Sequence, residues 1–259
     1  MSRLAARGVA CRRGDRVILD SVDIVLESGA VTALVGPNGS GKTTLLRHLA
    51  GLDAPAAGQV ALDGQPLAAL GALVRAQRIA YLAQAAAVYW PLLGRDVVSL
   101  GRLPHGADLS RPLAAADGAA VQRALGRVDG MALAGRSIDT LSQGERARLM
   151  LARILATEAE VVLADEPVAN LDPAYALDVM TVLRAEAARG AVVVVSLHDL
   201  GLAARFADRV IVLAGGRVTA DGPASEALRP VVIDEAYGIG FRTVEVDGVA
   251  QVIAWSRRP

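Results

Sequence analysis

The sequence predicts an α/β fold with an antiparallel β region at the N-terminus and a helical insertion, and three observations predict it. Residues before Gly29 alternate between apolar and polar side chains, which is typical of strands with one solvated face. Short continuous apolar runs at residues 30–35, 161–164 and 192–197 are typical of buried parallel strands. Between the first and second of these runs, residues 95–155 follow a helical pattern.

The other elements follow from local signals, taken in chain order. Residues 13–15 form the turn of the first β region, and a helix that begins at Gly41 stops at Gly51, because glycine favours a helix end. Residues 59–62, 78–83 and 209–213 are typical of further strands, and residues 241–253 of a terminal antiparallel ribbon. This order predicts one domain over residues 1–259, with a helical subdomain at about 95–155 and a short C-terminal extension at about 223–259.

Composition excludes several classes of protein. The chain has 259 residues, of which 53% are apolar and 21% charged, so a packed core is expected and disorder is not. The 27 Lys and Arg residues balance the 27 Asp and Glu residues, and aromatics are only 3%, which argues against a nucleic-acid partner. Cys11 is the one cysteine, so no intramolecular disulfide can form and a reducing compartment fits.

No segment has the length and composition of a transmembrane helix. The longest stretch without a charged residue or histidine, residues 79–94, contains Gln84 and Pro91 and is shorter than the roughly 20 apolar residues that span a bilayer. Arginines near the N-terminus interrupt any signal-peptide core. We therefore expect that the chain does not cross a membrane by itself, which leaves docking against a membrane protein open.

A glycine-rich loop between a predicted strand and a predicted helix carries the strongest chemical signal. The loop fits the pattern G-x-x-x-x-G-K-[ST] and consists of Gly36, Pro37, Asn38, Gly39, Ser40, Gly41, Lys42, Thr43 and Thr44. Its backbone N–H groups and the start of the following helix can cradle phosphates. Lys42 would reach the β- and γ-phosphates and the Thr43 hydroxyl would ligate Mg²⁺. The alternative, a glycine-rich turn with an exposed lysine, does not explain this context.

Two adjacent carboxylates end the apolar run at residues 161–164. Ligands of parallel sheets lie at the carboxyl ends of the strands, so Asp165 and Glu166 are expected to face the same crevice as the loop. Asp165 suits an indirect or water-mediated Mg²⁺ contact. Glu166 can turn toward the γ-phosphate and hold the attacking water as a general base. The alternative is a strand end with two solvated charges.

A third motif precedes the last helix of the helical segment. Ser142 and Glu145 have the spacing of a capping box, which is sufficient to start a helix. The helix has Met150/Ile154 and Leu151/Leu155 pairs at i, i+4 spacing on one face. The alternative is a second phosphate site made of Ser142, the Gly144 N–H and the helix dipole. Such a site makes most sense if it closes over the nucleotide of another copy of the chain.

Taken in order, these motifs resemble the nucleotide-binding subunit of ATP-binding cassette (ABC) transporters, a P-loop ATPase fold. Residues 36–44 resemble Walker A, residues 141–145 the signature motif and residues 161–166 Walker B. Gln84 matches the Q-loop glutamine, Asp172 closes a D-loop match at residues 170–172, and His198 matches the switch histidine. The resemblance covers about residues 9–222.

The resemblance implies a function for each of these residues. Glu166, His198, Gln84 and Lys42 would act in ATP hydrolysis, and Thr43, Gln84 and Asp165 would hold Mg²⁺. Two copies would pack head to tail, so that Ser142, Gly144 and Asp172 reach the nucleotide of the partner. The dimer would drive a membrane permease through the groove near Gln84 and residues 85–105, and it would serve an extracytoplasmic substrate-binding protein indirectly. The chain would lie at the cytoplasmic face of the inner membrane.

One position departs from the family pattern. An aromatic residue that stacks on adenine usually precedes Walker A, and residues 11–14 contain none. Arg13 is the expected replacement, because a guanidinium plane can stack on a base. This departure puts the adenine contact in doubt but leaves the phosphate chemistry unaffected.

Further stretches favour one subclass. Residues 97–105, 197–208 and 235–239 are similar to those in the ATPases of type II importers for iron–siderophores, haem and cobalamin. The alternatives are the ATPase of another ABC transporter, including an exporter, a non-transport ABC protein, and a nucleotide switch that barely hydrolyses ATP. The transported substrate is chosen by the permease and the binding protein, neither of which this sequence encodes.

Overall fold

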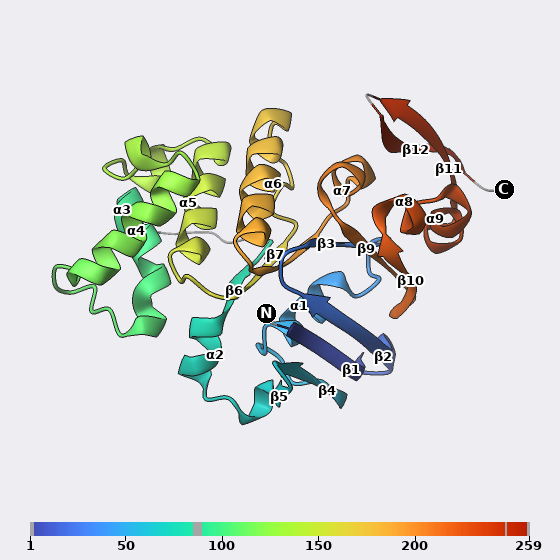
Figure 1. Ribbon diagram of the computed structural model, residues 1–259, viewed down its shortest axis with the longest axis horizontal. Helices are drawn as coiled ribbons and strands as arrows, with labels where there is room; N and C mark the ends of the chain where they lie inside the picture. The colour runs from blue at the N-terminus through green and yellow to red at the C-terminus, as the bar shows by residue number, and fades with distance from the viewer. Residues whose placement is uncertain (1–2, 85–89, 247, 258–259) are drawn as a thin grey trace.

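The fold is known from a computed structural model, which describes residues 3–84, 90–246 and 248–257 (Figure 1). Its centre is a sheet of strand order β10-β9-β3-β8-β7-β6. The neighbours from β9 to β6 are parallel, and β10 is antiparallel to β9. The strands are β3 (Val31–Val35), β6 (Ile79–Leu82), β7 (Val161–Asp165), β8 (Val192–Ser196), β9 (Arg209–Ala214) and β10 (Arg217–Pro223).

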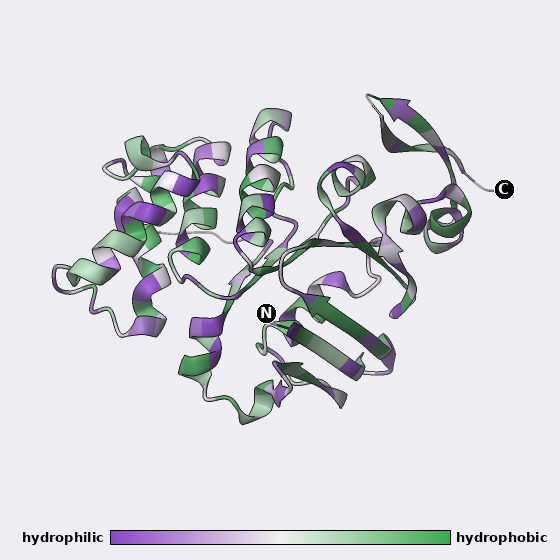
Figure 2. Cartoon of the chain, viewed as in Figure 1, coloured by the Kyte–Doolittle hydropathy of each residue, from purple (hydrophilic) through white to green (hydrophobic). Residues whose placement is uncertain are grey.

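The predicted apolar runs form the middle of this sheet. Every residue of β3, β7 and β8 is buried, as expected for strands that are covered on both faces. Figure 2 shows hydrophobic residues along the strands and mixed faces on the outer helices. The predicted α/β fold class is confirmed.

The N-terminal β region is a separate antiparallel sheet. It contains β1 (Arg3–Arg13), β2 (Arg16–Glu27), β4 (Ala57–Leu62) and β5 (Gln65–Pro66) in the order β2-β1-β4-β5. Helix α1 (Lys42–Leu49) packs between this sheet and the central sheet, with Leu45, Leu46 and Leu49 fully buried. Gly51, with φ of 66°, follows the end of α1 where the sequence predicts it. Because α1 begins directly after the glycine-rich loop, this packing fixes the position of the loop.

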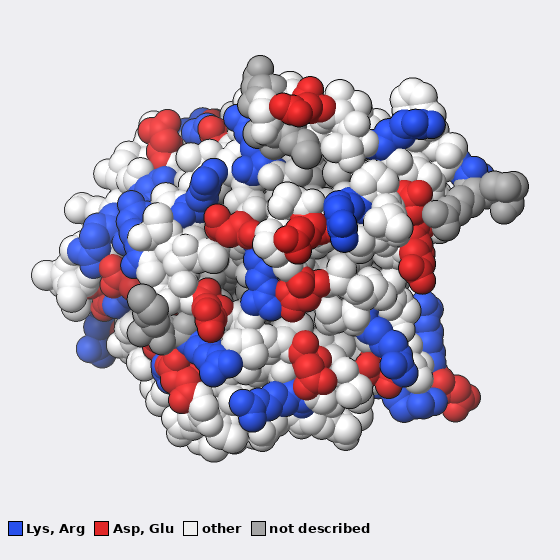
Figure 3. All heavy atoms as spheres, turned by 45° about the vertical axis from the view of Figure 1, so that its right-hand side comes forward, with Lys and Arg blue, Asp and Glu red and all other residues white. Residues whose placement is uncertain are grey.

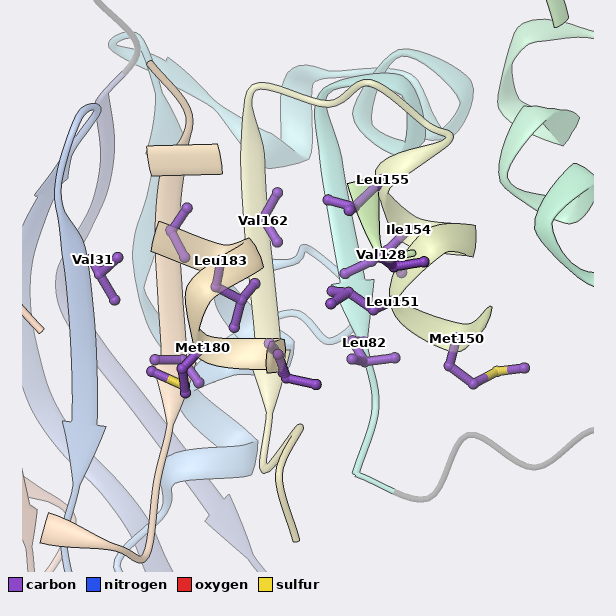
Figure 4. Close-up of a cluster of buried hydrophobic side chains, with 14 of the residues drawn as sticks. Val31, Leu82, Val128, Met150, Leu151, Ile154, Leu155, Val162, Met180 and Leu183 are labelled. Atoms are coloured by element: carbon purple, nitrogen blue, oxygen red, sulfur yellow. The ribbon is translucent and has the colours of Figure 1, made fainter. Parts of the chain in front are cut away.

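A helical lobe extends from the β6 side of the central sheet (Figure 1). It contains α3 (Gly94–Ser99), η2 (Leu100–His105), α4 (Ala115–Arg127), η3 (Met131–Leu133), η4 (Ile138–Thr140) and α5 (Gln143–Leu155). The predicted i, i+4 pairs of α5 are buried, with exposures of 6% at Met150, 5% at Ile154, 1% at Leu151 and 3% at Leu155. They join one core with side chains of the central sheet and of α6 (Pro173–Ala188) (Figure 4).

The remaining helices connect the strands of the central sheet or pack near its edge at β9 and β10. Helix α2 (Ala72–Arg78) precedes β6, and α7 (Leu200–Phe206) follows β8. The C-terminal segment consists of α8 (Ala224–Ala227), α9 (Pro230–Tyr237) and a two-stranded ribbon, β11 (Ile239–Val246) with β12 (Val249–Arg257). This segment lies at the opposite end of the molecule from the helical lobe (Figure 1). Within the described residues, no helix is both long and apolar enough to span a bilayer.

Candidate functional site

The glycine-rich loop connects β3 to α1 at the carboxyl end of the central sheet. Gly36 has φ of 149° and Gly41 has φ of 106°, conformations that favour glycine. A Cβ on Gly36 would lie 2.0 Å from the carbonyl oxygen of Leu213, and a Cβ on Gly41 would lie 2.8 Å from Cδ2 of Leu19. The loop is therefore wedged between the ends of β9 and β2, and only glycine fits at these two positions.

Lys42 is buried within the loop that it follows. Its Nζ donates to the carbonyl oxygens of Gly36 at 2.7 Å and of Pro37 at 3.2 Å. Burial lowers the pKa of Lys42 from its usual value, while the charges of Glu166 and Asp165 act in the opposite direction. The loop therefore bends around the ammonium group of Lys42. A loop of this shape can also surround an anion.

Two loop hydroxyls are suitably placed for an anion or its counter-ion. Ser40 is 3% exposed and its Oγ is buried without a hydrogen-bond partner among the described residues. Buried hydroxyls are rarely left without a partner. Thr43 is exposed and lines the hollow above the loop. The chemistry of these groups fits a phosphate and a hard cation.

Ser196, at the end of β8, contacts both acidic residues at the end of β7, Asp165 through its carboxylate and Glu166 through its backbone. Its Oγ donates to Oδ1 of Asp165 at 2.6 Å and accepts from the N–H of Glu166 at 2.8 Å. Asp165 is 1% exposed, and Oδ2 of Asp165 also lies 3.4 Å from the Tyr81 hydroxyl. Glu166 has φ of 48°, a left-handed conformation that turns the chain away from the strand. Its side chain is thereby directed into the hollow.

Two residues that are far from Glu166 in sequence, Gln84 and His198, both contact its carboxylate. Nε2 of Gln84 donates to Oε2 of Glu166 at 2.5 Å, and Nε2 of His198 lies 2.5 Å from Oε1. These residues follow β6, β7 and β8, whose carboxyl ends lie side by side. The Glu166 side chain is 11% exposed and that of His198 is 45% exposed. A carboxylate with two side-chain partners therefore stands beside the glycine-rich loop.

The loop and this cluster line one open hollow of about 650 Å³. Its lining residues include Gln84, Glu166, His198 and loop residues 38–44, together with Arg13, Arg16 and Ile18 of the N-terminal β region. Among the residues that the structure describes, no aromatic side chain lines this hollow, which agrees with the missing stacking residue in residues 11–14. Nη2 of Arg16 lies 3.4 Å from the position of a Cβ on Gly39, so a second arginine covers the loop.

The signature-like motif lies elsewhere on the chain. Ser142 caps α5 in a complete capping box, in which Ser142 Oγ accepts from the Glu145 N–H at 3.3 Å and Glu145 Oε2 accepts from the Ser142 N–H at 2.8 Å. The N–H of Ser142 holds the pKa of Glu145 below its usual value. Asp172 similarly caps α6. Ser142, Gly144 and Asp172 do not line the hollow of their own chain.

The structure adds residues that the sequence analysis does not identify. Ser196 is the single polar residue in the apolar run 192–197, a signal that could have been noticed. Arg16 and Tyr81 offer no comparable signal. In the predicted docking segment, residues 85–89 lie outside the described residues, and Trp90 is 71% exposed. A second hollow, of about 350 Å³, lies between Gln84 and residues of η4 and α5.

Charged side chains are interspersed on the face shown in Figure 3, where acidic and basic residues alternate over short distances. The formal charges of the whole chain also balance. The hollow is different, because three basic side chains, Arg13, Arg16 and Lys42, line it together with the carboxylate of Glu166.

Comparisons with known proteins agree with this geometry. A family profile described as ABC transporter matches residues 19–169. The chain is 46% identical over 239 residues to the hemin import ATP-binding protein of Nocardia farcinica, a match that covers 90% of this chain and 82% of that protein. It is 42% identical over 241 residues to the protein of the same name from Pseudomonas fluorescens, which covers 91% of this chain and 92% of that protein.

Solved structures share the fold. A metal-chelate type ABC transporter in an inward-facing conformation has a TM-score of 0.85 at 21% identity, over 98% of both chains. The dimeric structure of a bacterial ABC transporter cassette has a TM-score of 0.74 at 25% identity, over 85% of this chain and 98% of that chain.

Proposed function

The chain belongs to the ABC transporter family, and on this basis we propose that it is the ATP-hydrolysing subunit of an importer for haem or a related metal chelate. It is an ATPase of this family. One observation of the structure carries the assignment of the active centre: Gln84, Glu166 and His198 converge within 2.5 Å contacts beside a loop shaped for phosphates.

We propose a role in ATP binding or hydrolysis for several of the residues that line the hollow. The N–H groups of residues 39–44 and the ammonium group of Lys42 bind the β- and γ-phosphates. To do so, Lys42 gives up its hydrogen bond to the carbonyl oxygen of Gly36. Glu166 orients the attacking water and takes its proton. Gln84 and His198, which contact Glu166 in the structure, turn to the γ-phosphate when it is present. Arg13 stacks on the adenine, because it lines the same hollow as the glycine-rich loop and its guanidinium plane can stack on a base.

The residues present fit Mg²⁺ as the counter-ion of the phosphates. Thr43 offers an exposed hydroxyl, Asp165 a buried carboxylate, and Gln84 an amide oxygen, which are hard oxygen donors. When bound, Mg²⁺ would neutralise charge that develops on the phosphate oxygens. Ser196 prepares Asp165 for this role by holding one of its oxygens at 2.6 Å.

A second copy of the chain is the proposed partner across the hollow. Ser142, Gly144 and Asp172 lie outside their own hollow, and the Ser142 hydroxyl, which contacts Glu145 in the capping box, could turn its proton to a phosphate of the partner. A head-to-tail pair would therefore bring these groups over the nucleotide of the neighbour. The dimeric cassette that resembles this chain supports the proposal.

The membrane partners are proposed from the relatives. Proteins named for hemin import align with at least 90% of this chain, which favours haem over other solutes. We propose that a permease docks in the 350 Å³ hollow beside Gln84, so that the chain lies at the cytoplasmic face of the inner membrane. An extracytoplasmic substrate-binding protein would deliver the solute. The second candidate is an iron–siderophore, since a metal-chelate transporter shares the fold.

We propose that residues 1–259 act as a single ABC ATPase domain. The helical subdomain at about 95–155 would carry the signature motif, and the extension at about 223–259 would support the catalytic part. The shared core between α5, α6 and the central sheet favours this single unit.

The active-centre proposal is tested by Glu166→Gln, which keeps the size of the side chain and removes its basicity. We expect phosphate release to fall by about 10²–10⁴, the usual contribution of a general base, while ATP binding and ATP-dependent dimerisation persist. Glu245→Gln, at an exposed position of β11, is the matched control. Hydrolysis at the wild-type rate in Glu166→Gln, without a dimer at millimolar ATP, would overturn the assignment.

The substrate proposal needs the complete transporter. The chain would be purified with its permease in vesicles, and ATPase activity would be measured with a haem-loaded or a siderophore-loaded binding protein. Stimulation by the haem-loaded protein alone is expected. Stimulation by the siderophore-loaded protein alone would reassign the solute and leave the ATPase assignment intact.

A further inference from the structure

The hydroxyl of Tyr237, at the end of α9, contacts the first residue of the glycine-rich loop. It accepts a hydrogen bond from the N–H of Gly36 at 2.9 Å, across 201 positions of sequence. Gly36 is buried, so this N–H needs an acceptor inside the protein. An element of the C-terminal extension thus supplies a partner to the loop that is proposed to bind ATP.

Tyr237 is itself held in place by its neighbours. Its ring packs edge-on against Phe241, with ring centroids 5.4 Å apart and an interplanar angle of 76°. The N–H of Phe241 donates to Oδ1 of Asp234 at 2.8 Å, which ties the start of β11 to α9. Ile233, one turn earlier in α9, is fully buried in the core. The hydroxyl is therefore presented from a packed element and not from a loose tail.

Both the N–H and the carbonyl oxygen of Gly36 are hydrogen-bonded to side chains. The Tyr237 hydroxyl takes its N–H, and Lys42 Nζ donates to its carbonyl oxygen at 2.7 Å. When Lys42 turns to a phosphate, it gives up this carbonyl, and the Tyr237 contact remains. Burial raises the pKa of Tyr237 to about 12, so the hydroxyl stays neutral at physiological pH.

We propose that Tyr237 is a positioning residue of the nucleotide site, which holds the glycine-rich loop in its phosphate-binding shape through the N–H of Gly36. The C-terminal extension is then part of the ATPase site. This inference rests on the proposed role of the loop in ATP binding. Without the hydroxyl, Gly36 can turn its N–H toward other acceptors, the loop occupies other conformations, and binding must select the competent one.

The test compares Tyr237→Phe with Phe241→Leu in the full-length chain. Tyr237→Phe removes only the hydroxyl, whereas Phe241→Leu disturbs the ring packing and keeps the hydroxyl. We would measure Kd for ATP, ADP and inorganic triphosphate, kcat, and Tm without ligand. For Tyr237→Phe we expect Kd to rise about three- to tenfold for all three ligands, as the loss of one hydrogen bond gives, with kcat little changed.

The control separates positioning from stability. Phe241→Leu, which keeps the Tyr237 hydroxyl but loosens its ring packing, is expected to lower Tm more than Tyr237→Phe does and to raise the three Kd values less. Unchanged Kd values in Tyr237→Phe, or Kd values that follow Tm in both variants, would overturn the inference. A wild-type chain that binds neither ATP nor triphosphate would instead overturn the proposed function of the loop.

Discussion

Replacing Ser196 by alanine removes one hydroxyl that holds both the carboxylate of Asp165 and the backbone N–H of Glu166. Ser196 is fully buried, donates to the carboxylate of Asp165 at 2.6 Å and accepts the N–H of Glu166 at 2.8 Å. The side chain that remains is smaller by one oxygen and has no donor or acceptor. Both partners lose a hydrogen bond at a place that water does not reach easily, since Asp165 is 1% exposed.

The size of the effect follows from these two contacts. A hydrogen bond to a charged group contributes about 1.5–3 kcal/mol, and a buried N–H without a partner costs about 1–3 kcal/mol. Because the two losses share one hydroxyl and are not strictly additive, we expect the free energy of unfolding to fall by about 3 kcal/mol. Turnover should fall about tenfold or more, since Glu166 loses the bond that sets its backbone.

The assay is urea unfolding together with phosphate release, and Ser99→Ala is the matched control. Ser99 is 5% exposed, and within the described residues its hydroxyl donates to the carbonyl oxygen of Arg95 in the same helix, at 2.7 Å. Its replacement should cost about 1 kcal/mol or less and leave turnover unchanged. If Ser196→Ala proves no more destabilising than Ser99→Ala, the reasoning from the shared hydroxyl is wrong.

Three further predictions concern other parts of the chain. Arg13→Ala should raise KM for ATP and leave the single-turnover rate nearly unchanged; an unaltered KM in steady-state kinetics would refute the stacking role. Ser142→Ala should lower the free energy of unfolding by about 1 kcal/mol through the lost helix cap and weaken ATP-dependent dimerisation, which gel filtration measures; dimers of wild-type affinity would contradict the contact in trans. The pKa values of Tyr81 and Tyr237 are both raised to about 12 by burial, so the unfolded chain loses these protons at a lower pH than the folded chain. Stability should therefore fall between about pH 10 and pH 12, and urea unfolding of Tyr237→Phe should show a shallower fall; equal slopes would argue against the raised pKa.

Local signals in the sequence were sufficient for much of the fold. The runs that become β3, β7 and β8 are continuous and apolar because both faces of these strands are covered. The capping box of α5 and the glycine that follows α1 are likewise formed by neighbouring residues. By contrast, β10 has alternating exposed and half-buried residues, and α2 has no buried residue, so neither pattern stands out from a loop.

The candidate site shows the same division. The glycine-rich loop could be identified from nine consecutive residues, because phosphate binding uses backbone groups whose geometry neighbouring glycines permit. Glu166 could be proposed from its place at the end of an apolar strand, whereas Gln84 and His198 could be proposed only through a family resemblance, since their distances to Glu166 depend on the order of β6, β7 and β8 in the sheet. Ser196 and Arg16 acquire their roles from what lies across from them.

The amino-acid order alone therefore determined the phosphate-binding loop, the buried strands and the helix caps, because each depends on interactions between residues close along the chain. Only the tertiary structure decided that Glu166 meets Gln84 and His198, and that the Tyr237 hydroxyl reaches Gly36. These contacts join segments up to 201 positions apart, and their geometry is set by the packing of the whole core.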